Sequence, residues 1–217
     1  MTLKEMFSGL FSGKKEDQAE KPEEKKLSGG KKTGGKKTGG EKSSSKKVLM
    51  VIAPEKFRDE EFFEPKEIFE KEGFDITVAS VKKTTAVGAL GGKQKTDAAL
   101  SDLSADGFDG ICISGGGGSR TYLWDNKDLH RLINEFNDAG KPVGAICISP
   151  VVLAKAGVLK GRKCTVFNDE EGIKIIEESG SEVNPEKSMV CDGKIVTANG
   201  PKASVRFGRK MASLIRA

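Results

Sequence analysis

The fold is decided by one stretch, residues 141–157, which reads KPVGAICISPVVLAKAG. Its first half is an apolar run typical of a buried parallel strand. Pro150 suits the first turn of a helix, where its missing N–H is not needed. The stretch therefore predicts a strand, a sharp turn with Cys147 at its apex, and a helix.

Cys147 is the first candidate for chemistry. A thiol at the start of a helix lies near the positive end of the helix dipole and near unpaired backbone N–H groups. Both are expected to lower its pKa, which makes it a better nucleophile and a better target for oxidation. The alternative is a buried structural cysteine. The small residues before Cys147 and its place at the carboxyl end of a strand favour the reactive thiol.

Strands and helices alternate through the rest of the chain from about residue 47. Strands are expected at 48–53, 74–81, 108–114 and 164–167, and on both sides of an Asp192-Gly193 turn that predicts a hairpin. Helices are expected at 59–72, interrupted or restarted at Pro65, and at 127–137, 170–179 and 203–216. Residues 84–100 are expected to be irregular with short extended pieces. This pattern predicts an α/β fold with a doubly wound, mostly parallel sheet and helices on both faces.

Three loops leave the carboxyl ends of the predicted strands, which is where such sheets bind ligands. They are residues 54–59, the glycine run 115–118 and the turn at Cys147. The glycine run lacks the spacing of a nucleotide-binding loop. It is either a flexible connection or half of an oxyanion hole, in which the N–H of Gly116 or Gly117 pairs with the N–H of Ile148.

Glu61 is a candidate partner for Cys147. Acidic residues are common in a first helical turn, so its position alone carries little information. If it faces the cysteine, its protonated carboxyl can donate a hydrogen bond to the sulfur or act as a general acid and base. His130, the only histidine, lies in a predicted helix among surface-type residues and is a poor partner. Cys112, Cys164 and Cys191 lie in apolar strands and are expected in the core.

Charge separates residues 1–46 from a domain at 47–217. The whole chain has a formal net charge of +5, but the Lys/Gly-rich N-terminal part carries all of the excess, so the nearly neutral domain predicts no specific nucleic-acid binding. Residues 1–46 are expected to be a disordered tail, with a possible amphipathic helix at 2–11. The tail is a plain solvated segment or makes weak contacts with anionic partners.

The four cysteines show neither a CxxC motif nor the spacing of zinc ligands. No metal or other cofactor is therefore expected. The sequence contains no signal peptide pattern and no apolar run long enough to cross a membrane. A cytoplasmic protein with free thiols is the expectation.

The domain closely resembles the ThiJ/PfpI family. The resemblance rests on Val48–Ala53, Asp59-Glu60-Glu61 with Pro65, Asp109 with Gly115-Gly116, Ala145-Ile146-Cys147, residues 156–162 and residues 196–201. It implies a flavodoxin-like fold with a nucleophile elbow at Cys147, which serves as nucleophile and oxidation site. It also implies Glu61 as the carboxylate partner, Gly116 and the Ile148 amide as oxyanion donors, and homodimers or larger homo-oligomers.

The activities that the resemblance implies leave alternatives open. The first is a cysteine-dependent stress enzyme of glyoxalase or deglycase type, acting on small electrophilic carbonyls or glycated groups. The second is a redox sensor or chaperone-like protein with an oxidisable Cys147. A cysteine peptidase or amidase is a minor alternative, because Ile148 stands where many hydrolytic members have histidine. A glutamine amidotransferase is discarded, since no histidine follows the cysteine.

Overall fold

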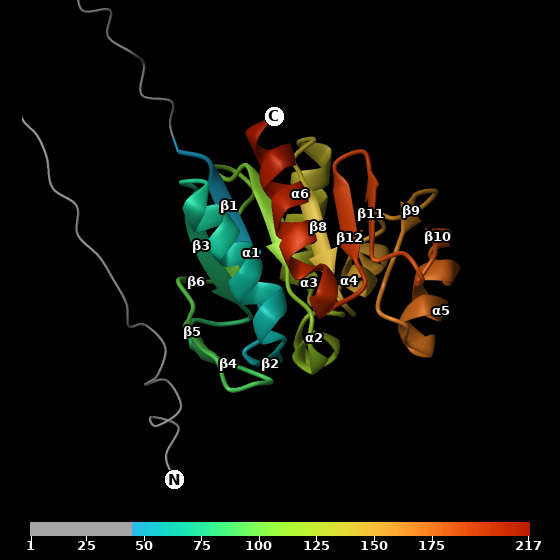
Figure 1. Ribbon diagram of the computed structural model, residues 1–217, viewed down its shortest axis with the longest axis horizontal. Coiled ribbons are helices and arrows are strands. Elements are labelled where there is room, and N and C mark those ends of the chain that lie inside the picture. Colours follow the sequence, from blue (N-terminus) through green and yellow to red (C-terminus); the bar gives the residue numbers. More distant parts are fainter. Residues whose placement is uncertain (1–44) are drawn as a thin grey trace, which may run out of the picture. The chain divides into compact units, whose positions relative to one another are not determined.

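The computed structural model describes residues 45–217 (Figure 1). The helix expected at 2–11 and all but the last two residues of the expected tail lie outside the described residues.

A seven-stranded sheet forms the centre of the fold. Its spatial order is β11-β12-β8-β7-β1-β3-β6, and every neighbouring pair is parallel except β11 with β12. The strands are β1 (Lys47–Val51), β3 (Asp75–Ser80), β6 (Ala98–Ala99), β7 (Gly110–Ile113), β8 (Val143–Ile146), β11 (Met189–Asp192) and β12 (Ile195–Ala198). The prediction of a mostly parallel sheet is confirmed, and so is the hairpin near Gly193.

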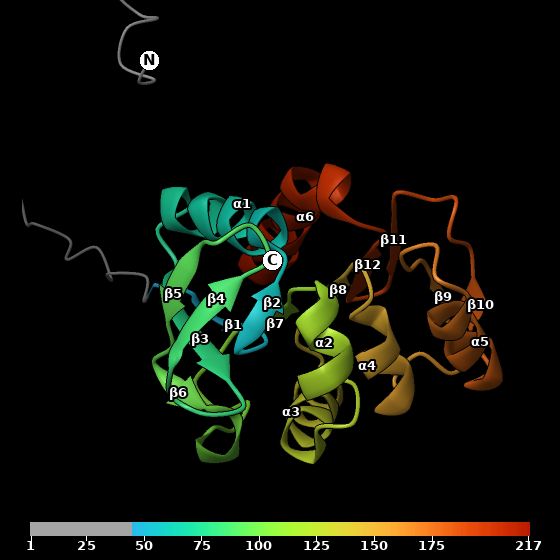
Figure 2. The same ribbon diagram turned by 90° about the horizontal axis from the view of Figure 1, so that it is seen from below.

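Helices cover both faces of this sheet (Figures 1 and 2). On one face α1 (Asp59–Lys71) packs against α6 (Ser204–Arg216). On the other lie α3 (Lys127–Asp138) and α4 (Pro150–Lys155). Helix α1 runs through Pro65 without a break, so the expected interruption is wrong. The strands between the helices are buried on both sides, which explains their unbroken apolar sequences.

Smaller elements surround the carboxyl edge of the sheet. A three-stranded sheet joins β2 (Glu55–Phe57), β4 (Thr85–Gly88) and β5 (Lys93–Lys95), so the region from 84 to 100 holds the short extended pieces that were expected. The glycine run does not remain a loop, because α2 (Gly117–Tyr122) begins inside it. The remaining elements are β9 (Lys163–Cys164), β10 (Glu182–Val183), α5 (Glu170–Glu178) and the 3-10 turns η1 (Leu100–Asp102) and η2 (Pro201–Ala203).

No helix within residues 45–217 is both long and apolar enough to cross a membrane.

Candidate active site

Cys147 lies in the turn between β8 and α4 with a strained backbone. Its φ is +64°, a left-handed conformation that residues other than glycine rarely adopt. The strain is maintained by two backbone hydrogen bonds: the N–H of Cys147 donates to Ala198 O at 2.8 Å, and the N–H of Phe167 donates to Cys147 O at 2.8 Å. The sharp turn predicted from the sequence is present, and neighbouring segments fix it from two sides.

The glycine run passes close to the segment that follows β1. Gly116 has φ +91°, and a Cβ on it would lie 2.4 Å from both Arg58 N and Lys56 O. Only glycine fits there, both for its dihedral angle and for its close backbone neighbours. The N–H of Arg58 donates to Gly115 O at 3.1 Å, so the first two of the three predicted loops are joined directly.

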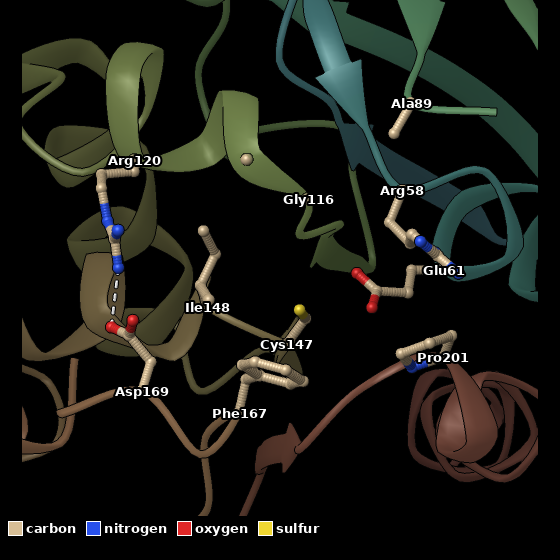
Figure 3. Close-up of a pocket in the computed structure, with 11 residues that line it drawn as sticks. Arg58, Glu61, Ala89, Gly116, Arg120, Cys147, Ile148, Phe167, Asp169 and Pro201 are labelled. Atoms are coloured by element: carbon tan, nitrogen blue, oxygen red, sulfur yellow. Dashed lines mark hydrogen bonds and ion pairs between the residues drawn. The ribbon is translucent and has the colours of Figure 1, made fainter. Parts of the chain in front are cut away.

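Glu61 reaches the same place from the first turn of α1. Its side chain is fully buried, and its Oε2 accepts a hydrogen bond from the N–H of Gly115 at 3.0 Å. Its Oε1 is buried without a hydrogen-bond partner among residues 45–217. In Figure 3 the carboxyl of Glu61 and the sulfur of Cys147 face one another across the floor of the pocket. The structure therefore brings together the two side chains singled out from the sequence.

Burial raises the pKa of both groups. Burial raises the pKa of Glu61 to about 7, against smaller lowering contributions from the thiol of Cys147 and the N–H of Gly115. Burial also raises the pKa of Cys147 to about 12, and the negative charge of Glu61 adds to that effect. The two groups titrate as a coupled pair. Near neutral pH, much of Glu61 holds a proton that it can give to the sulfur or to a bound oxygen.

The expectation of a lowered thiol pKa is thus wrong in direction. Helix α4 is only six residues long, so its dipole is small, and desolvation of the thiolate outweighs it. The backbone N–H groups of Gly116 and Ile148 do act on the sulfur, and each lowers the pKa of Cys147. The two donors expected from the sequence therefore lie beside the thiol, where they partly offset the cost of burial.

A pocket of about 450 Å³ opens above Cys147 (Figure 3). Arg58, Arg120, Phe167 and Asp169 line it together with the predicted residues. Arg120 donates to Asp169 Oδ2 at 2.7 Å, and its guanidinium lies 4.7 Å from the ring centre of Trp124. The sequence analysis singled out none of these four side chains, although Arg58 lies in the predicted loop 54–59, because no motif marks them. The one available signal was Phe167, an aromatic residue at the end of a predicted strand.

The remaining candidates lie apart from this pocket. The ring of His130 is bonded to Trp124 O at 2.8 Å and does not line the pocket. Cys112 and Cys164 are buried as expected, but Cys191 is exposed, because β11 is an edge strand of the sheet. Within residues 45–217 no group of three or more His, Cys, Asp or Glu side chains is arranged to hold a metal ion.

Comparisons with known proteins identify relatives of this chain. A family model described as the DJ-1/PfpI family matches residues 46–214. An uncharacterized protein of Methanocaldococcus jannaschii is 44% identical over 169 residues, which cover 78% of this chain and 82% of that protein. Protein/nucleic acid deglycase 2 of Escherichia coli is 31% identical over 175 residues, covering 80% of this chain and 99% of the relative.

A solved structure shows the same fold. The ThiJ/PfpI domain protein of Brachyspira murdochii superposes with a TM-score of 0.75 at 32% sequence identity, covering 79% of this chain and 97% of that one. The flavodoxin-like arrangement expected from the resemblance is therefore confirmed.

Proposed function

The chain belongs to the DJ-1/PfpI family, and on that premise we propose that it is a cysteine-dependent stress-response enzyme acting on reactive carbonyls or their adducts, of glyoxalase or deglycase type. One observation carries the proposal. Cys147, Glu61 and the N–H groups of Gly116 and Ile148 meet at the floor of one pocket.

The proposed reaction begins when the sulfur of Cys147 adds to an electrophilic carbonyl carbon. A C–S bond forms, the electrons of the C=O bond move to oxygen, and the N–H groups of Gly116 and Ile148 stabilise the developing charge. Glu61 carries the thiol proton to that oxygen. With a 2-oxoaldehyde, Glu61 then moves the proton of the former aldehyde carbon to the adjacent carbonyl carbon, while the hydroxyl proton of the adduct passes to the oxygen of that carbonyl. Water hydrolyses the resulting thioester to a 2-hydroxy acid and restores the thiol of Cys147.

The size of the pocket favours adducts over free small carbonyls. A volume of about 450 Å³ is typical of sites that bind ligands much larger than a three-carbon compound. Its apolar wall is formed by Ala89, Ile148, Phe167 and Pro201, and its rim carries the charged pair of Arg120 and Asp169. Such a pocket suits a carbonyl still attached to an amino-acid side chain or a thiol.

Formation of lactate from methylglyoxal and from a preformed methylglyoxal adduct of N-acetylarginine tests the proposal. Wild-type protein should release lactate from at least one of them. Cys147→Ala should lower the rate by about a thousandfold or more, because the nucleophile is lost. Cys191→Ala, at the exposed cysteine, is the matched control and should keep the wild-type rate. Full activity of Cys147→Ala would overturn the proposal.

A redox sensor is the second candidate, favoured by the unpartnered Oε1 of Glu61. A protonated Oε1 next to Cys147 could donate a hydrogen bond to a sulfinate oxygen. Selective oxidation of Cys147 by dilute peroxide, mapped by peptide mass spectrometry in a protein that releases no lactate, would favour the sensor. A peptidase is disfavoured by the position of His130, outside the pocket.

We also propose that the protein works in the cytoplasm as a homodimer or larger homo-oligomer. Light scattering coupled to gel filtration checks the assembly, and a monomer at micromolar concentration would contradict it.

A further inference from the structure

Three serine side chains are buried directly beneath the candidate site, and none of them lines the pocket. Ser114 is the first residue after β7, Ser119 lies in α2, and Ser149 is the second residue after Cys147. Their exposed fractions are 2%, 0% and 0%. Burying a hydroxyl costs free energy unless it is hydrogen-bonded, so the contacts of these three groups decide what they do.

The hydroxyls of Ser119 and Ser149 form a directional chain that ends on the backbone carbonyl of Ser114. Ser149 Oγ donates to Ser114 O at 2.8 Å, because a carbonyl oxygen can only accept. That bond uses the single hydrogen of the Ser149 hydroxyl. The 2.7 Å contact between Ser119 Oγ and Ser149 Oγ must therefore have Ser119 as its donor. The chain runs from α2, through the turn after Cys147, to the end of β7.

The hydroxyl of Ser114 makes a separate contact with the helix that carries Glu61. Pro65 lies four residues after Glu61 inside α1 and has no N–H to offer to the carbonyl of Glu61. The hydroxyl of Ser114 donates to that carbonyl instead, at 3.2 Å. This contact satisfies a buried backbone oxygen that the proline leaves without its helical partner, and it attaches α1 to β7 at the residue whose side chain faces Cys147.

Each serine thus holds a segment that supplies one part of the site. The backbone N–H of Ser119 donates to Gly116 O at 3.0 Å, and the Ser119 hydroxyl anchors this first turn of α2 to Ser149. Ser149 directly follows Ile148, the second donor. Ser114 directly precedes the Gly115-Gly116 pair.

We propose that Ser114, Ser119 and Ser149 are positioning residues that hold the N–H groups of Gly116 and Ile148, and the carboxyl of Glu61, in register around the sulfur of Cys147. The role concerns the proposed reaction and rests on that function. A misplacement of about 1 Å in such a site can cost about a hundredfold in rate. Buried hydrogen bonds that tie α2, the turn after Cys147 and α1 to the end of β7 suit this task, because a buried hydrogen bond restricts the groups that it joins.

The rate at which iodoacetamide alkylates Cys147, measured from pH 6 to pH 10 by peptide mass spectrometry, tests the proposal without any turnover. The variants are Ser149→Ala and Ser119→Ala. The matched control is Ser80→Ala, since Ser80 is also fully buried but its hydroxyl has no partner among residues 45–217. The exposed Cys191 serves as an internal standard in every sample.

Displaced N–H donors stabilise the thiolate less well. Ser149→Ala should therefore slow alkylation of Cys147 by roughly tenfold at pH 8 and shift its pH profile upward, and Ser119→Ala should do so by about threefold. The double variant should be no slower than Ser149→Ala, because both hydroxyls act through one chain. Ser80→Ala, and Cys191 in all variants, should react at the wild-type rates.

Where the wild type turns over a carbonyl substrate, kcat should fall in the two variants while KM stays unchanged. Wild-type alkylation profiles in both variants, with lowered melting temperatures only, would show that the serines merely stabilise the core and would overturn the proposal. If Ser149→Ala does not fold, Ser119→Ala decides alone, because it leaves the bond from Ser149 to Ser114 in place. Absence of turnover in the wild type would contradict the proposed function and leave the alkylation result standing.

Discussion

Cys191 lies within strand β11 and Cys147 directly follows strand β8 of the same sheet, but their surroundings are opposite. Cys191 is in the exposed edge strand β11, and its Sγ contacts Gly193 O at 3.4 Å in an ordinary hairpin. Cys147 is only 8% exposed, has a left-handed backbone and faces a buried carboxyl. The accessible thiol has no surrounding site, and the less accessible one has neighbours from three separate loops.

The proposed role of Cys147 implies that solvent access alone does not identify a reactive cysteine. Burial makes the thiolate of Cys147 costly, and the protein spends further free energy on backbone strain and on an unpartnered carboxyl oxygen. Such costs are typical of functional sites rather than of cores selected for stability. Within residues 189–198, the hairpin at Cys191 has no buried thiol, no strained non-glycine residue and no unpartnered carboxyl oxygen.

The largest difference in kcat is expected between variants of the carboxyl group beside Cys147 and of the carboxyl group beside Cys191. Glu61→Gln removes the proton carrier next to Cys147 and should lower kcat by about 10² to 10⁴. Asp192→Asn changes a carboxyl beside Cys191 in the same way and should leave kcat unaltered. Lactate release from the best substrate measures both. Comparable losses in the two variants would mean that Glu61 acts only through stability.

The second-largest difference is expected in the stability lost when Gly116, near Cys147, or Gly193, near Cys191, is replaced by alanine. Gly116→Ala places a methyl group against Arg58 N and Lys56 O at a positive φ, and should cost about 3 kcal/mol or more of unfolding free energy. Gly193→Ala also has a positive φ, but its nearest neighbour is the flexible end of Arg162 at 3.5 Å, so about 1 kcal/mol is expected. Urea unfolding checks this, and equal costs would contradict the tight fit of the glycine run.

The buried carboxyl predicts a stability effect that depends on pH. Because the pKa of Glu61 is raised from 4.5 to about 7 on folding, its contribution to stability is fully present below pH 4.5 and is lost as the pH rises through 7. Glu61→Gln should therefore match the wild type at pH 4.5 and exceed it by up to about 3 kcal/mol at pH 8, at about 1.4 kcal/mol per pKa unit. A difference that does not vary with pH would rule out the raised pKa.

The smallest effect is expected at the pocket wall. Phe167 is 46% exposed, so Phe167→Ala should leave the melting temperature nearly unchanged. Loss of its ring contact with substrate should raise KM by roughly three- to tenfold with little change in kcat. An unchanged KM for the adduct substrate would exclude Phe167 from binding.

Much of this architecture could be predicted from residues alone. Apolar runs such as Val48–Ala53 mark buried parallel strands, and the proline after Cys147 marks the start of a helix. The rule that parallel strands end at one edge of the sheet predicts that the three loops meet at Cys147, and the family resemblance singles out Glu61, Gly116 and Ile148 among their residues.

Other features depend on tertiary contacts that no local pattern encodes. The thiol pKa is raised because burial removes water from the sulfur and because Glu61 adds a negative charge, whereas the sequence shows only the helix start. Pro65 leaves the carbonyl of Glu61 without its helical N–H partner, but α1 continues, and the hydroxyl of Ser114 donates to that carbonyl instead. Cys191 is exposed because its strand lies at the edge of the sheet, and strand order cannot be read from the apolar pattern of a single strand.

Stepwise alkylation of the wild-type protein tests the central claim most directly. Samples taken during iodoacetamide treatment are analysed for the alkylated fraction of each cysteine and for residual turnover of the best carbonyl substrate. Cys191 should be modified first, with no loss of activity, and activity should then fall in proportion to modification of Cys147. Protein that keeps its activity with Cys147 fully alkylated, or that loses it as Cys191 reacts, would contradict the account.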